Sequence, residues 1–403
     1  MQRAALTGPP PRLAVPSTDE FAQRLARVRA SMADRSYGAL VVTDPANLYY
    51  LTGYNAWSFY MPQCLVLPAE ADPVLFARAM DAAGAGHTSW LPAEQVEGYP
   101  EDLVHRPDVH PFDWIARRIR ERELVAAGDR VGFEGDAHFF SARGYLALRA
   151  GLPDVDLEDS RELVNWVRVV KSAYELEQMR IAGAIAQLSM ETALEAIAPG
   201  QRQCDVVAQI SAAQARGTAE HGGDYPAVVP MLPTGDGAGT PHLTWTDQRF
   251  ESGAATTIEL AGVHRRYHSP LARTIMLGAP PSRLVDTASV VRDGMAEVLA
   301  AFAPGRTAHD IHAAWNSVIS AHGLVKESRI GYSVGLGYPP DWGEHTISLR
   351  PGEHVALEPG MCFHVILGMW MDGWGYELSE PVVLTPDGVE KLTDLPQDLT
   401  IRK

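Results

Sequence analysis

The chain has 403 residues, with 50 acidic and 34 basic side chains and a formal net charge of −16. Nucleic acids and anionic membranes are bound by basic surfaces that displace their counterions, so this charge argues against both as partners. A hydrophobic fraction of 46% and a charged fraction of 21% are typical of a globular protein with one or two well-filled cores. The three cysteines lie far apart and form neither a disulfide framework nor a zinc motif.

The N-terminal segment MQRAALTGPPPRLAVPS lacks the basic start and the continuous apolar run of a secretory signal. Its consecutive prolines are typical of a flexible arm, which we place at residues 1–17. No stretch of the chain approaches the roughly 18 apolar residues that span a membrane. We therefore expect a cytoplasmic protein.

Residues 18–165 alternate between helix and strand patterns, which predicts an α/β domain. Apolar residues recur at helical spacing from Asp19 to Ala33, and the strand pattern GALVVT follows. The aromatic segment DPANLYYLTGYNAW begins with a turn and contains Trp57. The remaining expected elements are strands at 64–69, 73–78 and 130–135, and helices at 111–124 and 141–150.

A change of pattern near residue 166 predicts the start of a second domain, which we assign to residues 166–403. A short β-like run, NWVRVVK, ends at Lys171. Ser172 and Glu175 then have the spacing of a capping box, in which each side chain accepts a hydrogen bond from the backbone N–H of the other residue. This motif predicts a long helix that reaches about Ile197.

The second domain mixes helices with antiparallel hairpins and is therefore predicted to be α+β. Helices are expected at 204–216, 283–302 and 308–322. The runs TTIELAG and YHSPLARTIML flank a polar turn, His264–Arg266, in the pattern of a hairpin. Near the C-terminus we expect a loop at GYSVGLGYPPDWGE, followed by strands around MCFHVIL and YELSEPVVL.

Glu259 lies in the middle of the first strand of this hairpin, among apolar neighbours. Burying a bare carboxylate is costly, so the group must be paired, protonated or part of a functional site. The structural alternative is a buried ion pair with Arg273 or Arg265. The functional alternative makes Glu259 the centre of a site.

A series of motifs along the whole chain resembles the M24-type family of creatinase, prolidase and methionine aminopeptidase. The motifs are NWVRVVKSAYELEQMRIAGAIA, PHLTW, IELAGVHRRYHSPLART, GYSVGLGYP, EPGMCF and ELSEPVVLTPDG. The resemblance implies a C-terminal pita-bread domain that follows a smaller α/β domain of the RNase-H-like type. It also implies a homodimer.

Metallopeptidases of this family bind two metal ions through two Asp, one His and two Glu. In this chain the ligand positions fall on Glu259, Pro270, Tyr332, Ile366 and Ser379. Proline and isoleucine offer no donor atom, whereas divalent metal ions in such a site need carboxylates and imidazole. We therefore expect no bound metal and no other cofactor. The general acid/base histidine of the family corresponds to His242.

Within the family, the segments TGYNAWSFY, GGDYPAVVP, YHSPLART, GYPPDWGE and GMWMDGWGYELSE most resemble the ectoine hydrolase branch. That resemblance implies ring opening of ectoine, a cyclic amidine that bears a carboxylate, to N-acetyl-diaminobutyrate. A planar amidinium cation is bound by carboxylates and aromatic faces. The residues that offer these groups are Glu259, Glu377, Asp224, Glu344, Tyr225, Tyr332, Trp342 and Trp57.

The alternation of side chains along a strand predicts that one histidine also faces the site, and that two glutamates close in the sequence point to opposite faces. In MCFHVIL, His364 shares a face of the strand with Ile366. In YELSE, Glu377 shares a face with Ser379, and Glu380 points to the opposite face. We therefore expect His364 and Glu377 to face the site and Glu380 to face away from it.

In the implied reaction, Glu259 is either a nucleophile that attacks the amidine carbon or a base that activates water. His242 protonates the leaving amine and later deprotonates water. The simpler alternatives make His242 a surface histidine, His364 a hydrogen-bonded core residue and the aromatic side chains loop packing. Trp57 reaches the site only if the N-terminal domain of the same subunit or of its partner covers it.

Three classes of function fit these features. The first is a metal-independent hydrolase that opens ectoine or hydroxyectoine, with a creatinase-like amidinohydrolase as a close variant. The second is a metal-dependent X-Pro dipeptidase or lyase of the same fold, and the third is a binding module without catalysis. The expected partners are a small zwitterionic substrate and a second copy of the chain. A pathway with an N-acetyl product would also need a deacetylase, which is a further candidate partner.

Overall fold

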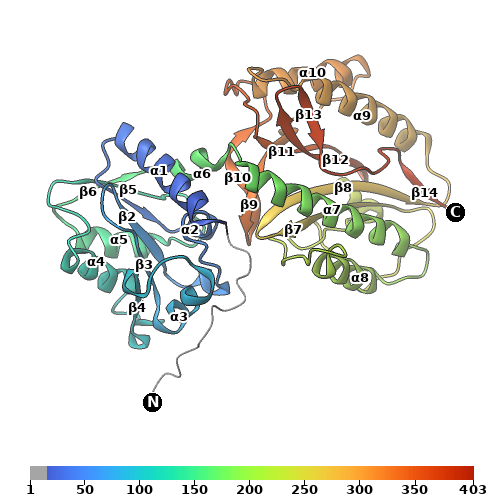
Figure 1. The fold of residues 1–403 in the computed structure, drawn as a ribbon. Helices are drawn as coiled ribbons and strands as arrows, with labels where there is room; N and C mark the ends of the chain where they lie inside the picture. Colours follow the sequence, from blue (N-terminus) through green and yellow to red (C-terminus); the bar gives the residue numbers. More distant parts are fainter. Residues whose placement is uncertain (1–15) are drawn as a thin grey trace. The chain divides into compact units, whose positions relative to one another are not determined.

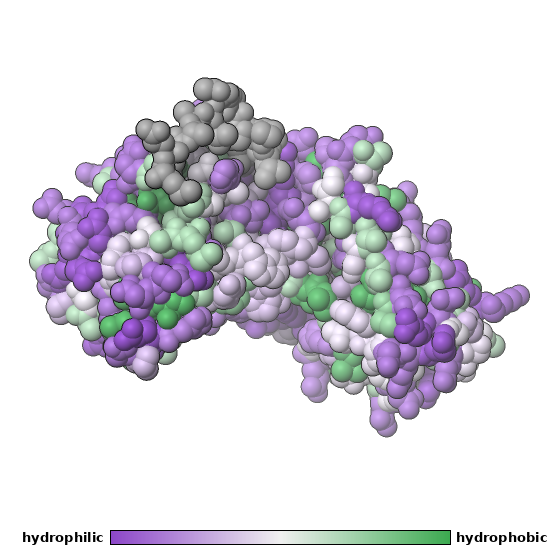
Figure 2. Space-filling model, turned by 90° about the horizontal axis from the view of Figure 1, so that it is seen from below, coloured by the Kyte–Doolittle hydropathy of each residue, from purple (hydrophilic) through white to green (hydrophobic). Residues whose placement is uncertain are grey.

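The computed structural model describes residues 16–403. Residues 1–15 of the expected N-terminal arm therefore lie outside the described residues. The chain forms two compact units, one ending at Arg168 and one spanning Val169–Lys403 (Figure 1). The described part of the chain contains no helix long and apolar enough to cross a membrane. On the face shown in Figure 2, hydrophobic residues form small separate groups among hydrophilic ones.

The N-terminal unit is a mixed β-sheet with packed helices. Its elements are α1 (Thr18–Asp34), β1 (Ala39–Val42), α2 (Pro45–Thr52), η1 (Trp57–Tyr60), β2 (Cys64–Pro68), β3 (Val74–Arg78), α3 (Ala79–Thr88), η2 (Ala93–Gln95), β4 (Val96–Tyr99), η3 (Glu101–Leu103), α4 (Pro111–Glu121), β5 (Arg130–Phe133), α5 (Ala142–Gly151), β6 (Asp156–Asp159) and α6 (Leu163–Arg168). The six strands run in the order β4-β3-β2-β1-β5-β6. β1 pairs antiparallel with β2 and parallel with β5. The helices and strands expected for this part are confirmed, but the segment expected to begin with a turn instead forms α2, with Asp44 as its N-cap.

The segment between the two units differs from the prediction at one point. The expected β-like run is wrong, because Leu163–Arg168 forms α6 and Val170 makes a single bridge with Met361. So short an apolar run cannot separate the helical period from the strand period. The capping box is confirmed, with Ser172 Oγ accepting from the Glu175 N–H at 3.3 Å and Glu175 accepting from the Ser172 N–H at 3.0 Å.

The C-terminal unit contains a larger sheet covered by helices. Its elements are α7 (Ala173–Ala196), α8 (Gln203–Arg216), η4 (Gly235–Gly239), β7 (Ala255–His264), β8 (Tyr267–Leu277), α9 (Ser282–Ala301), α10 (Ala308–Ala321), β9 (Gly331–Tyr338), β10 (Asp341–Ser348), β11 (Cys362–Met371), β12 (Trp374–Thr385), β13 (Gly388–Lys391) and β14 (Thr400–Arg402). The strand order is β13-β12-β11-β9-β8-β14, with β7 on β8 and β10 on β9.

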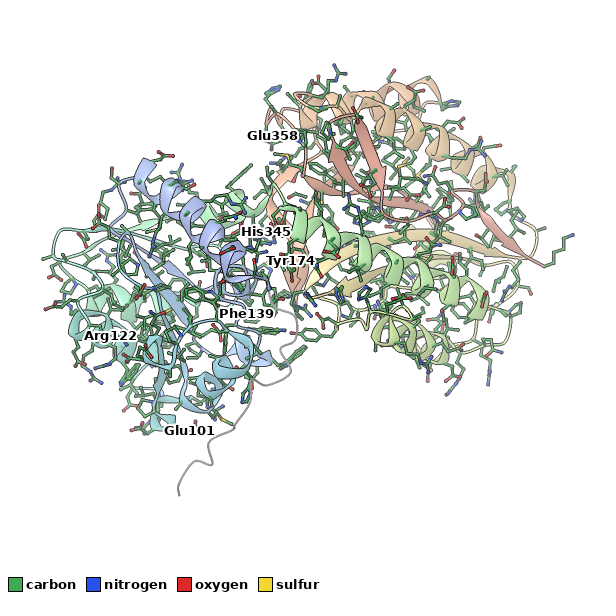
Figure 3. All side chains as sticks on the ribbon, viewed as in Figure 1. Glu101, Arg122, Phe139, Tyr174, His345 and Glu358 are labelled. Atoms are coloured by element: carbon green, nitrogen blue, oxygen red, sulfur yellow. The ribbon has the colours of Figure 1, made fainter. Side chains whose placement is uncertain are left out.

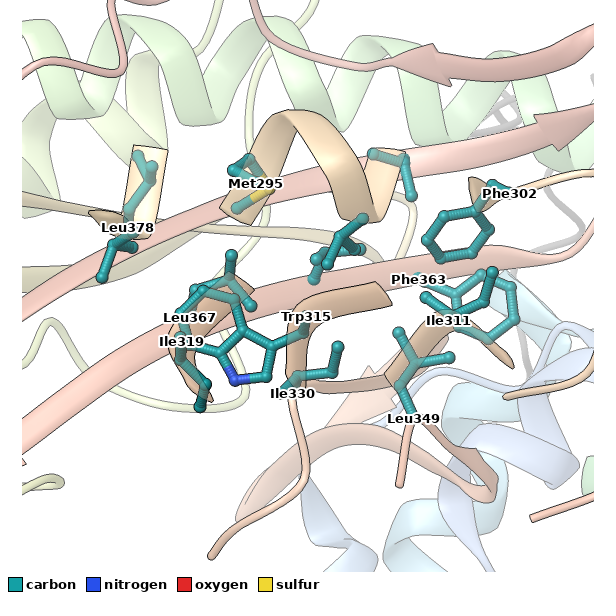
Figure 4. Close-up of a cluster of buried hydrophobic side chains, with 14 of the residues drawn as sticks. Met295, Phe302, Ile311, Trp315, Ile319, Ile330, Leu349, Phe363, Leu367 and Leu378 are labelled. Atoms are coloured by element: carbon teal, nitrogen blue, oxygen red, sulfur yellow. The ribbon is translucent and has the colours of Figure 1, made fainter. Parts of the chain in front are cut away.

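Helices pack against both the hairpin and the remaining strands of this sheet. α7 packs across β7 and β8 (Figure 1). The approach is so close that a Cβ on Gly262 would lie 2.1 Å from the carbonyl oxygen of Ala182. α9 and α10 contribute to a large core, in which Trp315 lies among buried residues of β11 such as Phe363 and Leu367 (Figure 4). These two layers hold the strands that carry the candidate site.

The β7–β8 hairpin is confirmed, and its turn is held by a buried arginine. Arg265 and Arg266 have φ values of 48° and 66°, which a two-residue turn requires but which usually select Asn and Gly. The guanidinium of Arg266 lies between the rings of Tyr225 and Tyr338, at 3.9 and 4.5 Å from their centroids. It also donates to the carbonyl oxygen of Gly337 at 2.8 Å. These contacts stabilise a turn that the backbone alone disfavours.

The loop expected at GYSVGLGYPPDWGE is wrong, because this segment lies in the strands β9 and β10. Its glycines are required by close packing inside the sheet. A Cβ on Gly335 would lie 2.4 Å from Glu344 Oε1, and one on Gly337 would lie 2.9 Å from Trp342 Cα. Glycine in a strand often marks such a close approach, so a high glycine content here did not indicate a loop.

Candidate active site

Two buried glutamates that form no ion pair within the described residues lie at the centre of the candidate site. Glu259 on β7 is 7% exposed and Glu377 on β12 is 4% exposed. Within residues 16–403, no side chain forms a hydrogen bond or an ion pair with either carboxylate. The ion pair considered for Glu259 is not formed, because Arg273 pairs with Glu380 at 2.7 Å and Arg265 donates to the hydroxyl of Tyr174.

The environment of these glutamates favours their protonated forms. Burial, followed by the negative charges of Glu377 and Asp341, raises the pKa of Glu259 well above its usual range. Burial also raises the pKa of Glu377 to about 7, against the opposing effect of the Lys326 ammonium group. Two interacting buried carboxylates share protons, so they are not both ionised at neutral pH without a nearby cation.

The long strand β8 sets the positions of both glutamates. Ala272 lies directly opposite Glu259 in the hairpin, and its N–H donates to Ser379 Oγ on β12 at 2.6 Å. The hydroxyl of Thr274 accepts from the N–H of Glu377 at 2.8 Å and donates to its carbonyl oxygen at 2.9 Å. These bonds connect β7, β8 and β12 in one register, so the two carboxylates meet at the same site.

A chain of hydrogen bonds lies beside the glutamates. Ser379 Oγ is 2.8 Å from His364 Nε2, and His364 Nδ1 is 3.2 Å from the hydroxyl of Tyr332. The same hydroxyl accepts from Trp342 Nε1 at 2.8 Å. Burial and the charge of Glu259 raise the pKa of Tyr332, which keeps the phenol protonated. The strand-face prediction is confirmed, because His364 and Ser379 are in contact while Glu380 faces Arg273.

Asp341, at the start of β10, is a third carboxylate of the site that the sequence analysis missed. It accepts from His345 at 2.9 Å, and His345 is labelled in Figure 3. Burial opposes ionisation of Asp341, but hydrogen bonds from His345 and the Gly343 N–H outweigh this effect and lower its pKa. An ionised Asp341 therefore acts on Glu259. In the sequence, Asp341 is an acidic residue between Pro340 and Trp342. It was missed because this segment was interpreted as a loop.

Two cations at the edge of the site were also missed. Lys326 donates to the carbonyl oxygen of Gly368 at 2.7 Å and lies 4.1 Å from the ring centroid of Trp370. Burial lowers its pKa to about 8, against the opposing charge of Glu377. The Arg329 guanidinium lies 4.3 Å from the ring centroid of Tyr332. Single basic residues before a strand are common, so no sequence pattern distinguished them.

Three residues expected in the site have other roles in the same unit. Asp224 accepts from the N–H of Arg266 at 3.0 Å, so it supports the hairpin turn. The ring of Tyr225 lies against the guanidinium of Arg266. Glu344 forms a fully buried ion pair with Lys171 at 2.6 Å. These contacts pair the charge of Glu344 and place Asp224 and Tyr225 at the hairpin turn.

The two remaining expected residues are exposed. His242 lies on the loop after η4, is exposed and has a φ of 65°. Trp57 belongs to the N-terminal unit, where its side chain is 58% exposed and its ring lies 5.3 Å from that of Phe59. The described structure thus brings together Glu259, Glu377, Tyr332, Trp342 and His364.

The donor set does not fit a two-metal centre. Pro270 and Ile366 have no donor atoms, and the hydroxyls of Tyr332 and Ser379 are hydrogen-bonded to His364. Across residues 16–403, no group of three or more His, Cys, Asp or Glu side chains is arranged to hold a metal ion. Divalent metals at such sites require several carboxylate and imidazole ligands.

Family models match both units of the chain. The model of the creatinase/prolidase N-terminal domain matches residues 24–170, and that of metallopeptidase family M24 matches residues 177–386. The chain belongs to metallopeptidase family M24. The ectoine hydrolase of Halomonas elongata is 42% identical to this M24 protein over 390 residues, which cover 95% of this chain and 98% of that one. A probable dipeptidase PepE of Mycobacterium tuberculosis is 25% identical and covers 94% of this chain and 96% of its own.

Solved structures of M24 proteins share the fold. The prolidase of Thermococcus sibiricus superposes with a TM-score of 0.81 at 18% identity, covering 95% of this chain and 99% of that one. The dipeptidase PepE of Mycobacterium ulcerans gives a TM-score of 0.79 at 23% identity, with coverages of 96% and 98%. The expected pita-bread fold with a preceding N-terminal domain is confirmed, and the M24 protein is a hydrolase.

Replacing Glu377 by Gln should stabilise the M24 protein at high pH. Because the folded pKa of Glu377 is about 7 against an ordinary value of 4.5, the folded chain holds a proton that the unfolded chain releases between these pH values. Stability linked to this group is therefore present below about pH 4.5 and is lost as the pH rises through 7. We expect Glu377→Gln to raise the free energy of unfolding by about 3 kcal/mol at pH 8 and to change it little at pH 4.5.

Urea denaturation at the two pH values measures this difference. Glu358→Gln, at an exposed acid of the same unit, is the matched control and should show no such pH dependence (Figure 3). An equal effect of Glu377→Gln at both pH values would show that the carboxylate does not titrate between them.

Proposed function

We propose that this M24 protein opens the cyclic amidine ring of ectoine, or of hydroxyectoine, by a hydrolysis that uses no metal ion. The observation that carries this proposal is the buried pair of Glu259 and Glu377, in which neither carboxylate forms a hydrogen bond or an ion pair within residues 16–403. A buried carboxylate pair of this kind is stabilised when a cation enters. The 42% identity to a protein named ectoine hydrolase supports the choice of a cyclic amidinium as that cation.

Binding of the amidinium ion prepares the reactive group. Its positive charge offsets the repulsion from Glu377 and Asp341, so Glu259 loses its proton as the substrate binds. Aromatic rings attract planar cations, and Tyr332 and Trp342 are hydrogen-bonded to each other beside Glu259. The same charge that holds the substrate thus generates the carboxylate that reacts with it.

Glu259 then acts in one of two ways. As a nucleophile, its oxygen forms a bond to the amidine carbon while the C=N π electrons move to nitrogen. Protonation of one nitrogen by His242 lets the amine leave, and water then cleaves the bond to Glu259 and releases the N-acetyl product. As a base, Glu259 takes a proton from water, and the hydroxide attacks the same carbon while the C=N π electrons move to nitrogen. Protonation of one ring nitrogen by His242 then breaks its bond to this carbon, which opens the ring and leaves the N-acetyl group. In both routes the imidazole of His242, on the exposed loop after η4, contacts the leaving nitrogen of the bound substrate.

The proposal is tested with purified, chelator-treated protein. We expect ring opening of ectoine, followed by proton NMR, to continue at an unchanged rate after metal removal. Creatine and an X-Pro dipeptide, incubated in parallel, should remain intact. Cleavage of the dipeptide alone, and only after addition of Mn²⁺ or Co²⁺, would instead identify a metal-dependent dipeptidase.

A further inference from the structure

We propose that the hydroxyl of Tyr332 donates a hydrogen bond to the carboxylate of the substrate, and that Ser379 and His364 hold it in this donor role. The inference rests on the proposed function and concerns the anionic end of the zwitterion. It makes Tyr332 a specificity-determining residue, with Ser379 and His364 as positioning residues behind it.

Ser379 fixes the direction of the first bond. Its side chain is fully buried, and its oxygen accepts from the N–H of Ala272 at 2.6 Å. In the described part of the chain, the remaining partner of this hydroxyl is His364 Nε2, at 2.8 Å. The hydroxyl proton must therefore point to Nε2, because a buried O–H group without an acceptor is unfavourable.

The hydrogen bond from Ser379 determines which ring nitrogen of His364 donates to Tyr332. A nitrogen that accepts a proton from Ser379 carries none itself, so the neutral ring holds its proton on Nδ1. Burial, with the charge of Arg329 as a second cause, lowers the pKa of His364 to about 3, so the ring stays neutral. The Nδ1–H group then donates to the Tyr332 hydroxyl oxygen at 3.2 Å.

The oxygen of Tyr332 is thereby used twice as an acceptor. It accepts from His364 Nδ1 and from Trp342 Nε1, the second at 2.8 Å. Its own proton cannot point to either donor and is directed away from both. Tyr332 is only half-buried, and the charge of Glu259 acts on it, so the proton is presented to the candidate site.

A fixed donor at this position complements one end of the substrate. The amidinium group of ectoine carries N–H donors, which the glutamates accept, while its carboxylate is the strong acceptor. The Arg329 guanidinium, 4.3 Å from the ring centroid of Tyr332, adds positive charge beside this side chain. Arg265 and Arg266 are engaged elsewhere, with Tyr174 and with the carbonyl of Gly337.

Two substrates distinguish a contact between Tyr332 and the substrate carboxylate from a general loss of binding or activity. They are ectoine and the same ring without its carboxylate, 2-methyl-1,4,5,6-tetrahydropyrimidine. We expect Tyr332→Phe to raise KM for ectoine about tenfold, which is the loss of one hydrogen bond to a charged group, and to leave KM for the second compound nearly unchanged. An equal loss on both compounds would overturn the contact.

Variants of Ser379 test the chain behind Tyr332. In Ser379→Ala the ring is free to protonate at Nε2, and Tyr332 then donates to Nδ1 instead of to the substrate. We expect the same selective rise in KM for ectoine, although Ser379 does not touch the substrate, and its rescue in Ser379→Thr. Ser333→Ala is the matched control, because its hydroxyl bonds to Thr346 at 2.6 Å outside this chain. Unchanged selectivity in Ser379→Ala would overturn the relay.

A spectroscopic measurement separates this inference from the proposed function. Nitrogen-15 NMR of the histidine-labelled protein, assigned with His364→Gln, should show a neutral ring protonated on Nδ1, and protonation on Nε2 would refute the relay. If the wild-type protein opens neither ring, the proposed function fails and the contact with a substrate carboxylate fails with it. The spectrum still decides the direction of the hydrogen bonds in that case.

Discussion

The variant Glu259→Gln is expected to lower kcat for ectoine ring opening by about 10⁴-fold or more, because the amide can neither attack the amidine carbon nor remove a proton from water. Substrate should still bind, since Glu377 and Asp341 remain to hold the cation. Single-turnover assays by NMR, with ligand binding followed by calorimetry, measure both quantities. Activity within tenfold of the wild type would remove Glu259 from the mechanism.

The control for this variant is Glu358→Gln, which removes an exposed carboxylate from the same unit and should leave kcat unchanged. A second measurement distinguishes the two roles of Glu259. If Glu259 is the nucleophile, mass spectrometry of His242→Ala after addition of substrate should detect an adduct on it. A base that activates water forms no adduct.

The variant Glu380→Gln is expected to lower the free energy of unfolding by about 3 kcal/mol, because it leaves the buried guanidinium of Arg273 without a counterion. Arg273 is 2% exposed and donates to Glu380 at 2.7 Å. Glu380 also accepts from Thr393 and Gln397, so the carboxylate is fully hydrogen-bonded. Urea denaturation at pH 7 measures the loss.

The double variant Glu380→Gln with Arg273→Met should recover most of this stability, because it removes the unpaired charge as well. If the single variant loses less than about 1 kcal/mol, the pair is not a net source of stability. The contrast with Glu377→Gln is informative. Two glutamates three positions apart on β12 are expected to respond with opposite signs, because Glu380 forms an ion pair with Arg273, whereas burial raises the pKa of Glu377 despite the charge of Lys326.

Local patterns were sufficient for much of the fold. The capping box at Ser172 and Glu175, the β7–β8 hairpin and the long helices follow from spacing along a single segment, which a helix or strand repeats in a fixed way. Strand alternation also separated Glu377 from Glu380, since successive side chains point to opposite faces. The strands β9 and β10 were missed because their glycines are required by close contacts with other segments, which the local sequence does not show.

The partners of charged side chains were less accessible to sequence analysis. Asp224 and Tyr225 look like site residues by type, yet they contact Arg266, which lies about forty residues away along the chain. Asp341, Lys326 and Arg329 carry no local pattern, and they matter because the sheet places them beside Glu259, Glu377 and Tyr332 respectively. Such pairings depend on distances between segments.

By itself the sequence determined which chemical groups stand at the positions that correspond to the metal ligands of similar metallopeptidases, and thus that Pro270 and Ile366 offer no donor atom there. It also determined that Glu259 is buried, because a carboxylate in an apolar strand must be. Only the tertiary structure decided that Glu259 has no cation partner and that Glu377 lies close enough to repel it. The reason is physical: burial and residue type follow from local periodicity, whereas charge pairing and proton direction depend on contacts across β7, β8, β9, β11 and β12.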